Sequence, residues 1–189
     1  MLRLFVLLLT LSFLTACSTR QEGAYFKGST EQRLVTYSID KMMQTITPQD
    51  MSVLSDQKVF IKSHFVIDNQ IVKYAHQRLQ IELAERFQVR LMNSADQADY
   101  RLDMFYTSLG TDRDSTGISV PIVNLSDPEQ SAIVNILAVD MYHGIAEGNF
   151  YLTDLRNGKV LQKGKIHSRV RSDKFSTPFF SFPISNIDD

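Results

Sequence analysis

The stretch KVFIKSHFVIDNQIVKYAHQRLQIELAERF, residues 58–87, changes its hydrophobic period once, and this change decides the fold class. Over residues 58–68 the apolar side chains alternate, which predicts a strand that buries one face. The residues expected on that face are Val59, Ile61, Phe65 and Ile67. After Asp68-Asn69, residues 71–87 have the spacing of an amphipathic helix. The apolar stripe of this helix contains Val72, Ala75, Leu79, Leu83 and Phe87.

A second helix is predicted before this stretch, over residues 29–46. Its start has the Ser-x-x-Gln pattern of a capping box, from Ser29 to Gln32, and it should end before Pro48. After residue 87 the sequence predicts a short strand over 89–92, a turn over 95–98 and a strand over 100–109. The apolar face of that last strand is expected to hold Leu102, Met104 and Tyr106.

The remainder of the chain is rich in strand signals. Residues 110–128 contain Gly110, Gly117, Pro121 and Pro128 and are predicted to be a loop around an apolar alternation. Residues 133–141 fit a strand or a helix, and their β-branched side chains favour the strand. Two further strands, 148–154 and 159–171, are joined through Asn157-Gly158, a hairpin signal. This order predicts an α/β two-layer sandwich, a mixed β-sheet with two main helices packed on one face.

The loop length of this hairpin decides which residues share a face. A two-residue loop would place Leu152 opposite Lys163 and Phe150 opposite Lys165, which mixes apolar and charged side chains. A three-residue loop, 156–158, with a left-handed Gly158 avoids this mixture. It gathers Leu152, Phe150, Val160 and Ile166 on one face, so we expect the three-residue loop.

Basic residues occupy every second position near the end of the chain. We call them the basic row: Lys163, Lys165, His167, Arg169 and Arg171. A period of two places them on one face of the strand, while Ile166 and Val170 point the other way. The basic row is a candidate face for binding an anion or an acidic partner. The alternative is a solvated sheet face whose charge discourages edge pairing.

The composition limits the function classes. The chain has 189 residues, a formal net charge of −1, 43% hydrophobic and 22% charged residues, and a single cysteine. These values suit one folded domain and exclude an intramolecular disulfide. They argue against a nucleic-acid partner, since nucleic-acid-binding domains are normally strongly basic.

The N-terminus has the layout of an export signal. Arg3 precedes an apolar run over residues 4–14 that is shorter than the roughly 18–20 residues needed to cross a bilayer. Leu14-Thr15-Ala16-Cys17 follows and resembles the lipobox of bacterial lipoproteins. The resemblance implies cleavage between Ala16 and Cys17, diacylglycerol on the Cys17 sulfur and a further acyl chain (palmitate) on the new amino terminus. Because Ser18 stands where an aspartate would retain the protein at the inner membrane, it also implies anchoring at the outer membrane, facing the periplasm.

Four segments are therefore expected along the chain. Residues 1–16 form the signal peptide, 17–28 a lipidated polar tether, 29–175 the α/β domain, and 176–189 a tail rich in Phe and Pro. The tail either docks on a partner or membrane or folds back over a sheet edge.

Short motifs in the mature part carry a second resemblance. Ala98-Asp99-Tyr100 and the hairpin segment 152–160 resemble the periplasmic domains of bacterial assembly lipoproteins, notably the one that forms the curli secretion channel. Thr30-Glu31-Gln32 and Gly110-Thr111-Asp112 resemble a family of small envelope lipoproteins with no assigned function. Both resemblances imply an envelope accessory or assembly role without catalysis.

The usual catalytic and metal-binding patterns do not occur in this sequence. It contains no Gly-x-Ser-x-Gly elbow and no Gly-rich phosphate loop. The four histidines, His64, His76, His143 and His167, lack the spacing of zinc ligands, so no metal and no cofactor is expected. Asp112-Arg113-Asp114 is interpreted as a polar loop in preference to a cation site. The function expected is a non-enzymatic envelope accessory protein with a protein partner or an oligomeric state. The alternative is a lipid or glycolipid carrier with a pocket between helix 71–87 and the sheet.

Overall fold

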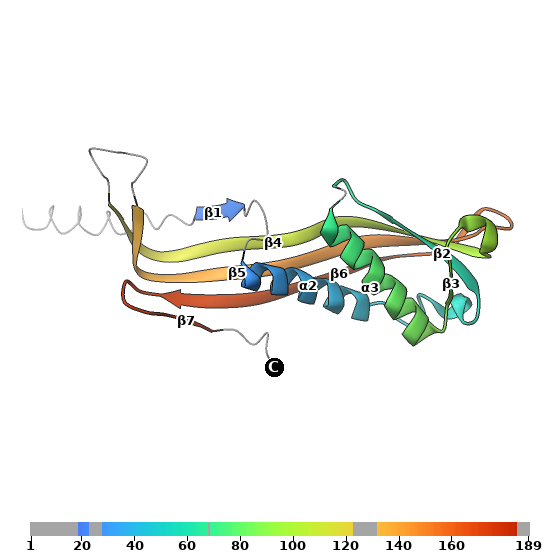
Figure 1. Ribbon diagram of the computed structural model, residues 1–189, viewed down its shortest axis with the longest axis horizontal. Helices are drawn as coiled ribbons and strands as arrows, with labels where there is room; N and C mark the ends of the chain where they lie inside the picture. The colour runs from blue at the N-terminus through green and yellow to red at the C-terminus, as the bar shows by residue number, and fades with distance from the viewer. Residues whose placement is uncertain (1–18, 23–27, 68, 123–131, 185–189) are drawn as a thin grey trace, which may run out of the picture. The chain divides into compact units, whose positions relative to one another are not determined.

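The computed structural model describes residues 19–22, 28–67, 69–122 and 132–184 (Figure 1). Its helices are α2 (Ser29–Gln44) and α3 (Gln70–Phe87), with short 3₁₀ turns at Ser52–Leu54 and Ala95–Gln97. Its strands are β1 (Thr19–Glu22), β2 (Lys58–His64), β3 (Arg90–Met92), β4 (Tyr100–Ile122), β5 (Ala132–Asp154), β6 (Lys159–Ser176) and β7 (Ser181–Pro183).

The chain divides into two compact units. The helix-covered unit comprises Phe26–Thr111 and Gly144–Val170, and the strand unit comprises Met1–Tyr25, Asp112–His143 and Arg171–Asp189. Strands β4, β5 and β6 each contribute residues to both units. The domain boundaries expected from the sequence stay predictions.

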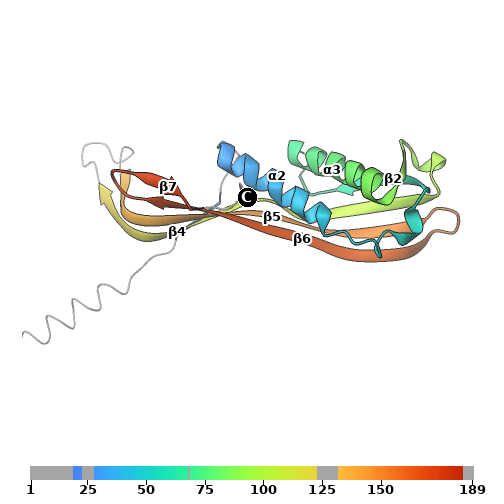
Figure 2. The ribbon, with the colours of Figure 1, turned by 90° about the horizontal axis from the view of Figure 1, so that it is seen from below.

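The sheet is mixed. In the described residues its strands follow the order β3-β2-β4-β5-β6-β7, with β1 paired to β4. Strand β2 runs parallel to both β3 and β4, whereas β1 and β7 are antiparallel to their neighbours. In the helix-covered unit α2 and α3 lie on the same face of the strands (Figure 2). The predicted two-layer α/β class is confirmed.

The core of the helix-covered unit lies between the helices and the sheet. Leu79 and Leu83 of α3 and Leu102 and Met104 of β4 are fully buried there. From β5 and β6 the sheet adds Phe150, Leu152 and Ile166. At roughly 25 cal/mol per Å² of apolar surface removed from water, this layer is the main stabilising contribution of the unit.

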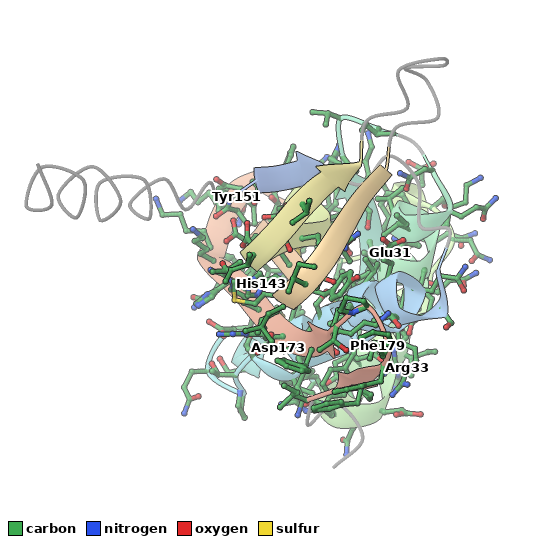
Figure 3. All side chains as sticks on the ribbon, turned by 90° about the vertical axis from the view of Figure 1, so that its left-hand side faces the viewer. Glu31, Arg33, His143, Tyr151, Asp173 and Phe179 are labelled. Carbon is green, nitrogen blue, oxygen red and sulfur yellow. The ribbon has the colours of Figure 1, made fainter. Side chains whose placement is uncertain are left out.

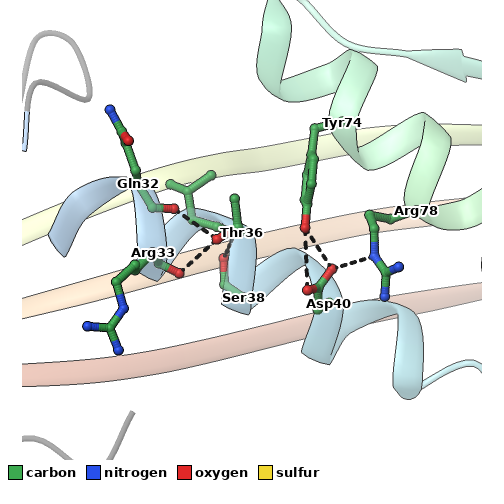
Figure 4. Close-up of polar contacts among 8 residues, drawn as sticks. Gln32, Arg33, Thr36, Ser38, Asp40, Tyr74 and Arg78 are labelled. Carbon is green, nitrogen blue, oxygen red and sulfur yellow. Dashed lines mark hydrogen bonds and ion pairs between the residues drawn. The ribbon is translucent and has the colours of Figure 1, made fainter. Parts of the chain in front are cut away.

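The two helices are joined by polar contacts at both ends of their interface. Asp40 of α2 accepts hydrogen bonds from the Tyr74 hydroxyl at 3.1 Å and from Arg78 Nε at 2.7 Å (Figure 4). Near the C-terminal end of α2, Arg86 of α3 donates to the carbonyl oxygens of Met43 and Ile46 at 3.5 and 3.1 Å. A cation there is favourable, because it lies at the negative end of the helix dipole and adds a donor to carbonyls around the helix end.

Several element boundaries differ from the sequence prediction. Helix α2 begins after Gly28, whose N–H donates to Glu31 Oε2 at 3.4 Å, so the cap lies one residue before the predicted Ser29. Strand β2 ends at His64; Phe65 is only partly buried, and Ile67 is 58% exposed. The predicted apolar face therefore holds for Val59 and Ile61 and fails for Ile67, because the strand has ended before it.

The largest error concerns residues 110–122, which continue strand β4 where a loop was predicted. A Cβ on Gly117 would lie 2.1 Å from the Leu137 carbonyl oxygen. The glycine here allows close approach of the neighbouring strand, and it does not end the strand. The predicted Asp112-Arg113-Asp114 loop is likewise part of β4. There Arg113 contacts Asp140 at 3.1 Å and Asp114 lies 3.6 Å from His143 Nε2.

Parts of the predicted tether and tail form strands. Thr19–Glu22 is β1 and pairs with residues 112–115 of β4. Ser181–Pro183 is β7 and folds back on β6, which was one of the two alternatives for the tail. Residues 185–189 lie outside the described residues.

The hairpin between β5 and β6 has the face arrangement expected for the longer loop. Gly158 is left-handed, with φ of 71°, and its N–H donates to the Asp154 carbonyl at 2.8 Å. Leu152, Phe150 and Ile166 are buried together, as predicted, whereas Val160 is 55% exposed. Gly164 faces Phe150, because a Cβ there would lie 2.5 Å from the ring. Strand β5 ends at Asp154 and β6 begins at Lys159, so the connection is residues 155–158, one residue longer than expected.

Truncation of the core should be costly. We expect Leu79→Ala and Leu102→Ala each to lower the free energy of unfolding by about 2–5 kcal/mol, because both side chains are fully buried. Phe65→Ala should cost less, because that ring is only partly buried. Urea unfolding followed by circular dichroism measures the difference. Ile81→Ala, on the exposed side of α3, is the control and should change it little. Equal losses at Leu79 and Ile81 would contradict the assigned helix face.

Candidate partner-binding face

The sheet of the helix-covered unit has a face that the helices do not cover. Ile166 of β6 is 2% exposed and points into the core, so the residues on either side of it point away. Lys163, Lys165, His167 and Arg169 are all exposed on that side, which we call the open face. None of these four forms an ion pair with a described residue. The alternation that predicted this part of the basic row is thus present in the structure.

Arg171, the last member of the basic row, belongs to the strand unit. Its Nε donates to Asp173 Oδ1 at 2.7 Å, and this hydrogen bond raises the pKa of the Arg171 guanidinium. Arg171 is exposed, but its charge is already compensated. It therefore differs from the four basic side chains of the helix-covered unit.

Aromatic side chains share the open face with the four basic side chains. The parallel register pairs His64 of β2 with Phe105 of β4, and their rings stack with centroids 4.3 Å apart. Tyr151 of β5 meets the Phe105 ring edge-on at 5.8 Å. Phe105 is 41% exposed and Tyr151 38% exposed, so both present large apolar surfaces to solvent.

A shallow groove runs across these strands, with a volume of about 370 Å³. We call it the open groove; it is lined by Arg101, Asp103, Phe105, Asn149, Tyr151, Thr153 and Val160. Asp103 accepts hydrogen bonds from Arg101 Nε at 2.7 Å and lies 3.0 Å from His64 Nε2. The one acid in the groove is thus held by two basic groups. Aromatic side chains and arginine, which line this groove as Phe105, Tyr151 and Arg101, are enriched at protein interfaces.

A second groove of about 420 Å³, the inner groove, lies between β2 and α3. It is lined by Ile61, Lys62, Ser63, Val72, Lys73, His76 and Gln77. Its position matches the pocket that the sequence suggested for a lipid carrier, between helix 71–87 and the sheet. Apolar Ile61 and Val72 with two lysines beside them would suit an anionic amphiphile.

A serine and a histidine meet in the inner groove. Ser63 Oγ lies 2.8 Å from His76 Nδ1, and burial lowers the pKa of His76. Tyr106 is buried nearby, and its burial raises the pKa of its hydroxyl, an effect that Ser63 partly offsets. Among the described residues no carboxylate contacts His76, so the group that orients the base in a hydrolase triad does not complete this pair.

Sequence reasoning identified some of these residues and missed others. It predicted the exposure of the basic row. It did not select Phe105, His64 or Asp103, although alternation along β4 implies that odd-numbered residues there face away from Leu102 and Met104. The contact between Ser63 and His76 had no sequence signal, because it depends on how α3 packs against β2. Ala16 and Cys17, the predicted cleavage and lipidation positions, lie outside the described residues.

Neither a membrane-spanning helix nor a cluster of metal ligands is found in residues 19–22, 28–67, 69–122 and 132–184. Within these ranges no helix is both long and apolar enough to cross a bilayer. No group of three or more His, Cys, Asp or Glu side chains in the described part of the chain could hold a metal ion.

Comparisons with known proteins find little. No protein-family model and no curated protein matches the sequence. Among solved structures, the C-terminal domain of LpoB from Salmonella enterica superposes with a TM-score of 0.38 at 9% identity, covering 70% of this chain and 96% of that domain. The same domain from Escherichia coli has a TM-score of 0.37 at 11% identity, with the same coverage. At these TM-scores the likeness supports no inference about function.

The lowered pKa of His76 predicts a pH dependence of stability. The folded chain disfavours the charged imidazole, whereas the unfolded chain takes up a proton near the ordinary value of 6.5. The contribution of neutral His76 is therefore present above pH 6.5 and is lost as the pH falls through the lowered pKa of the folded state. We expect the free energy of unfolding, measured in urea, to decrease from about pH 7 to about pH 5.

The test variant is His76→Gln, and Gln77→Ala on the same helix is the control, because it changes an exposed side chain that carries no ionisable group. The first should flatten this part of the pH profile, whereas the second should leave the profile unchanged. If His76→Gln shows the same slope as the wild type, burial of the His76 ring does not control its protonation.

Proposed function

We propose that this chain is a lipid-anchored accessory or assembly protein of the bacterial envelope that has no catalytic activity of its own. Its anchor is lipid on Cys17, at the outer membrane and facing the periplasm. Its binding surface is the open face of the helix-covered unit. This face binds an acidic surface of a protein partner. The observation that carries the proposal is the set of four exposed basic side chains, Lys163, Lys165, His167 and Arg169, without ionic partners among the described residues.

The physical argument rests on spacing and surroundings. Alternate residues on a strand are roughly 6–7 Å apart, which is within the Debye length of roughly 8–10 Å, so their charges repel one another. An acidic partner would relieve this repulsion and accelerate association. The exposed Phe105 and Tyr151 add apolar area to the same face. Such a mixture favours a protein surface over a uniform layer of head groups.

The inner groove supports a second candidate function, a carrier for lipid or glycolipid. Lys62 and Lys73 stand beside the apolar Ile61 and Val72 in a groove of about 420 Å³. A lipid that co-purifies with the chain in a one-to-one ratio would favour this function.

Charge reversal tests the binding face. The chain carrying Lys163→Glu and Lys165→Glu should fold normally, because both side chains are exposed, and should lose its protein partner. The measurement is affinity purification from mildly solubilised envelopes, followed by mass spectrometry of the bound protein and lipid. Binding by the wild type should itself weaken as salt rises.

The matched control is Arg33→Glu with Lys41→Glu, which makes the same charge change on α2, away from both grooves' lining residues. This control should keep the protein partner. If both double variants retain the partner equally, the basic row is a solvated face. If the wild type binds anionic vesicles and no protein, the open face binds a membrane and the protein-partner proposal is wrong.

The anchor has its own test. Cys17→Ser should prevent acylation and leave an unprocessed precursor or a soluble form, because the lipid chains need the cysteine sulfur. Membrane flotation and intact mass are measured for the wild type and the variant. Unchanged flotation together with unchanged mass would show that Cys17 carries no lipid.

A further inference from the structure

The strand unit ends in a hairpin that exposes phenylalanine. Strand β7 pairs with the end of β6, with Phe175 opposite Phe182, and the rings of Phe175, Phe180 and Phe182 lie 5.1–6.4 Å apart. Phe179, next to β7 in Figure 3, is 93% exposed. Phe180, Phe182 and Ile184 are also exposed, by 57%, 47% and 54%. We call residues 174–184 the phenylalanine hairpin.

Local hydrogen bonds hold this hairpin in shape. The Thr177 N–H donates to the Phe180 carbonyl at 2.9 Å, and the Phe180 N–H donates to Thr177 Oγ1 at 3.1 Å. Pro178, whose ring fixes φ, stands directly before Phe179. The exposed ring is thus presented by an ordered turn, and its exposure is a property of the folded strand unit. A contiguous exposed apolar patch of this kind usually marks a contact surface.

The length of chain between the predicted lipid and β1 indicates what covers this patch. Only Ser18 separates Cys17 from Thr19, the first residue of β1. At roughly 3.3–3.6 Å per residue, a lipid on Cys17 would lie within about 7 Å of β1. Strand β1 pairs with residues 112–115 of β4, so it belongs to the same unit as the phenylalanine hairpin. A lipid anchor on Cys17 would therefore hold this unit at the bilayer surface.

The direction of the strands strengthens this argument. Thr19 pairs with Ser115 and Glu22 with Asp112, so β1 starts toward the C-terminal end of β4. Within the strand unit β6 runs the same way as β4, which brings the β6–β7 turn to that end as well (Figure 1). The lipid-bearing end of β1 and the tip of the phenylalanine hairpin thus lie toward the same end of the sheet in this unit.

We propose that the phenylalanine hairpin is a second membrane contact, which inserts Phe179 and its neighbours into the bilayer interface at the same end of the strand unit's sheet as the lipid anchor. This inference rests on the proposed lipidation of Cys17. The acyl chains on Cys17 would give stable attachment, and the aromatic patch, on the opposite edge of the sheet from β1, adds a contact that orients the strand unit on the bilayer. Lys174, exposed at the base of the hairpin, can place its ammonium group among lipid phosphates while its stem lies along the apolar surface.

The absence of tryptophan from the chain makes a direct test possible. Phe179→Trp puts the only indole at the tip of the hairpin. Val66→Trp is the matched control, because Val66 is an apolar side chain that is 91% exposed in the helix-covered unit. Each lipidated variant is incorporated into vesicles of phosphatidylethanolamine and phosphatidylglycerol with brominated acyl chains. Flotation reports the anchor, and tryptophan emission reports contact with the acyl region.

We expect both variants to float. The emission of Trp at 179 should shift to shorter wavelength and fall by roughly half, since interfacial side chains reach about 5–10 Å into the acyl boundary. The emission of Trp at 66 should not change. Flotation with no quenching at 179, or with equal quenching at both positions, would overturn the membrane contact and leave the anchor intact. Loss of flotation would overturn the anchor and, with it, the geometric basis of the contact.

An unlipidated chain provides a second readout. In the Cys17→Ser background, Phe179→Asp should weaken binding to the same vesicles about tenfold or more, which is the effect of losing one buried aromatic side chain. Val66→Asp should leave that binding unchanged. An emission shift at 179 that depends on protein concentration without vesicles would instead show contact with a second copy of the chain, and would contradict the membrane assignment.

Discussion

The apolar layer between the helices and the sheet is the constraint on which the helix-covered unit depends. Successive side chains of a strand point to opposite faces, so burying Leu102 and Met104 in β4 also fixes where Asp103 and Phe105 lie. The packing of α2 against the sheet is tight. A Cβ on Gly144 of β5 would lie 2.3 Å from the Leu34 carbonyl oxygen. The helix backbone thus rests almost directly on the strand, and a shift of the register by one residue would exchange the buried and exposed faces.

The composition of the open face follows from this constraint. Ile166 is anchored in the core, and Lys165 and His167 on either side of it along β6 are forced outward. Gly164 has the matching role on the buried side, because it leaves room for the Phe150 ring. A strand that alternates basic residues with glycine and apolar residues therefore builds part of the core and a charged surface at once. The aromatic contacts of Phe105 then place apolar area on the same surface as the cations.

The two units support different parts of the proposed function. The basic side chains without ionic partners belong to the helix-covered unit, whereas Arg171 in the strand unit is compensated by Asp173. The exposed phenylalanines and the strand that directly follows Cys17 belong to the strand unit. The charged surface proposed to bind a protein partner and the apolar surface proposed to contact a membrane thus belong to different units. This separation lets each surface be altered without changing the other.

The sequence by itself determined the elements whose hydrophobic period is regular over many residues. Helix 71–87, the buried face of strand 100–109 and the exposure of the basic row in the helix-covered unit all follow from periods of 3.6 and 2. It also predicts a lipobox at residues 14–17, a covalent pattern that needs no fold, and this stays a prediction. The sequence did not determine that Gly117 and Pro121 lie in a strand, because both residue types are typical of loops. Glycine also occurs where two strands approach closely, and this is its role at position 117. Only the tertiary structure decided that residues 110–122 extend β4, that Ser63 meets His76, and that His64 stacks on Phe105. Each of these depends on pairing between segments distant in sequence, and local patterns carry no information about such pairing.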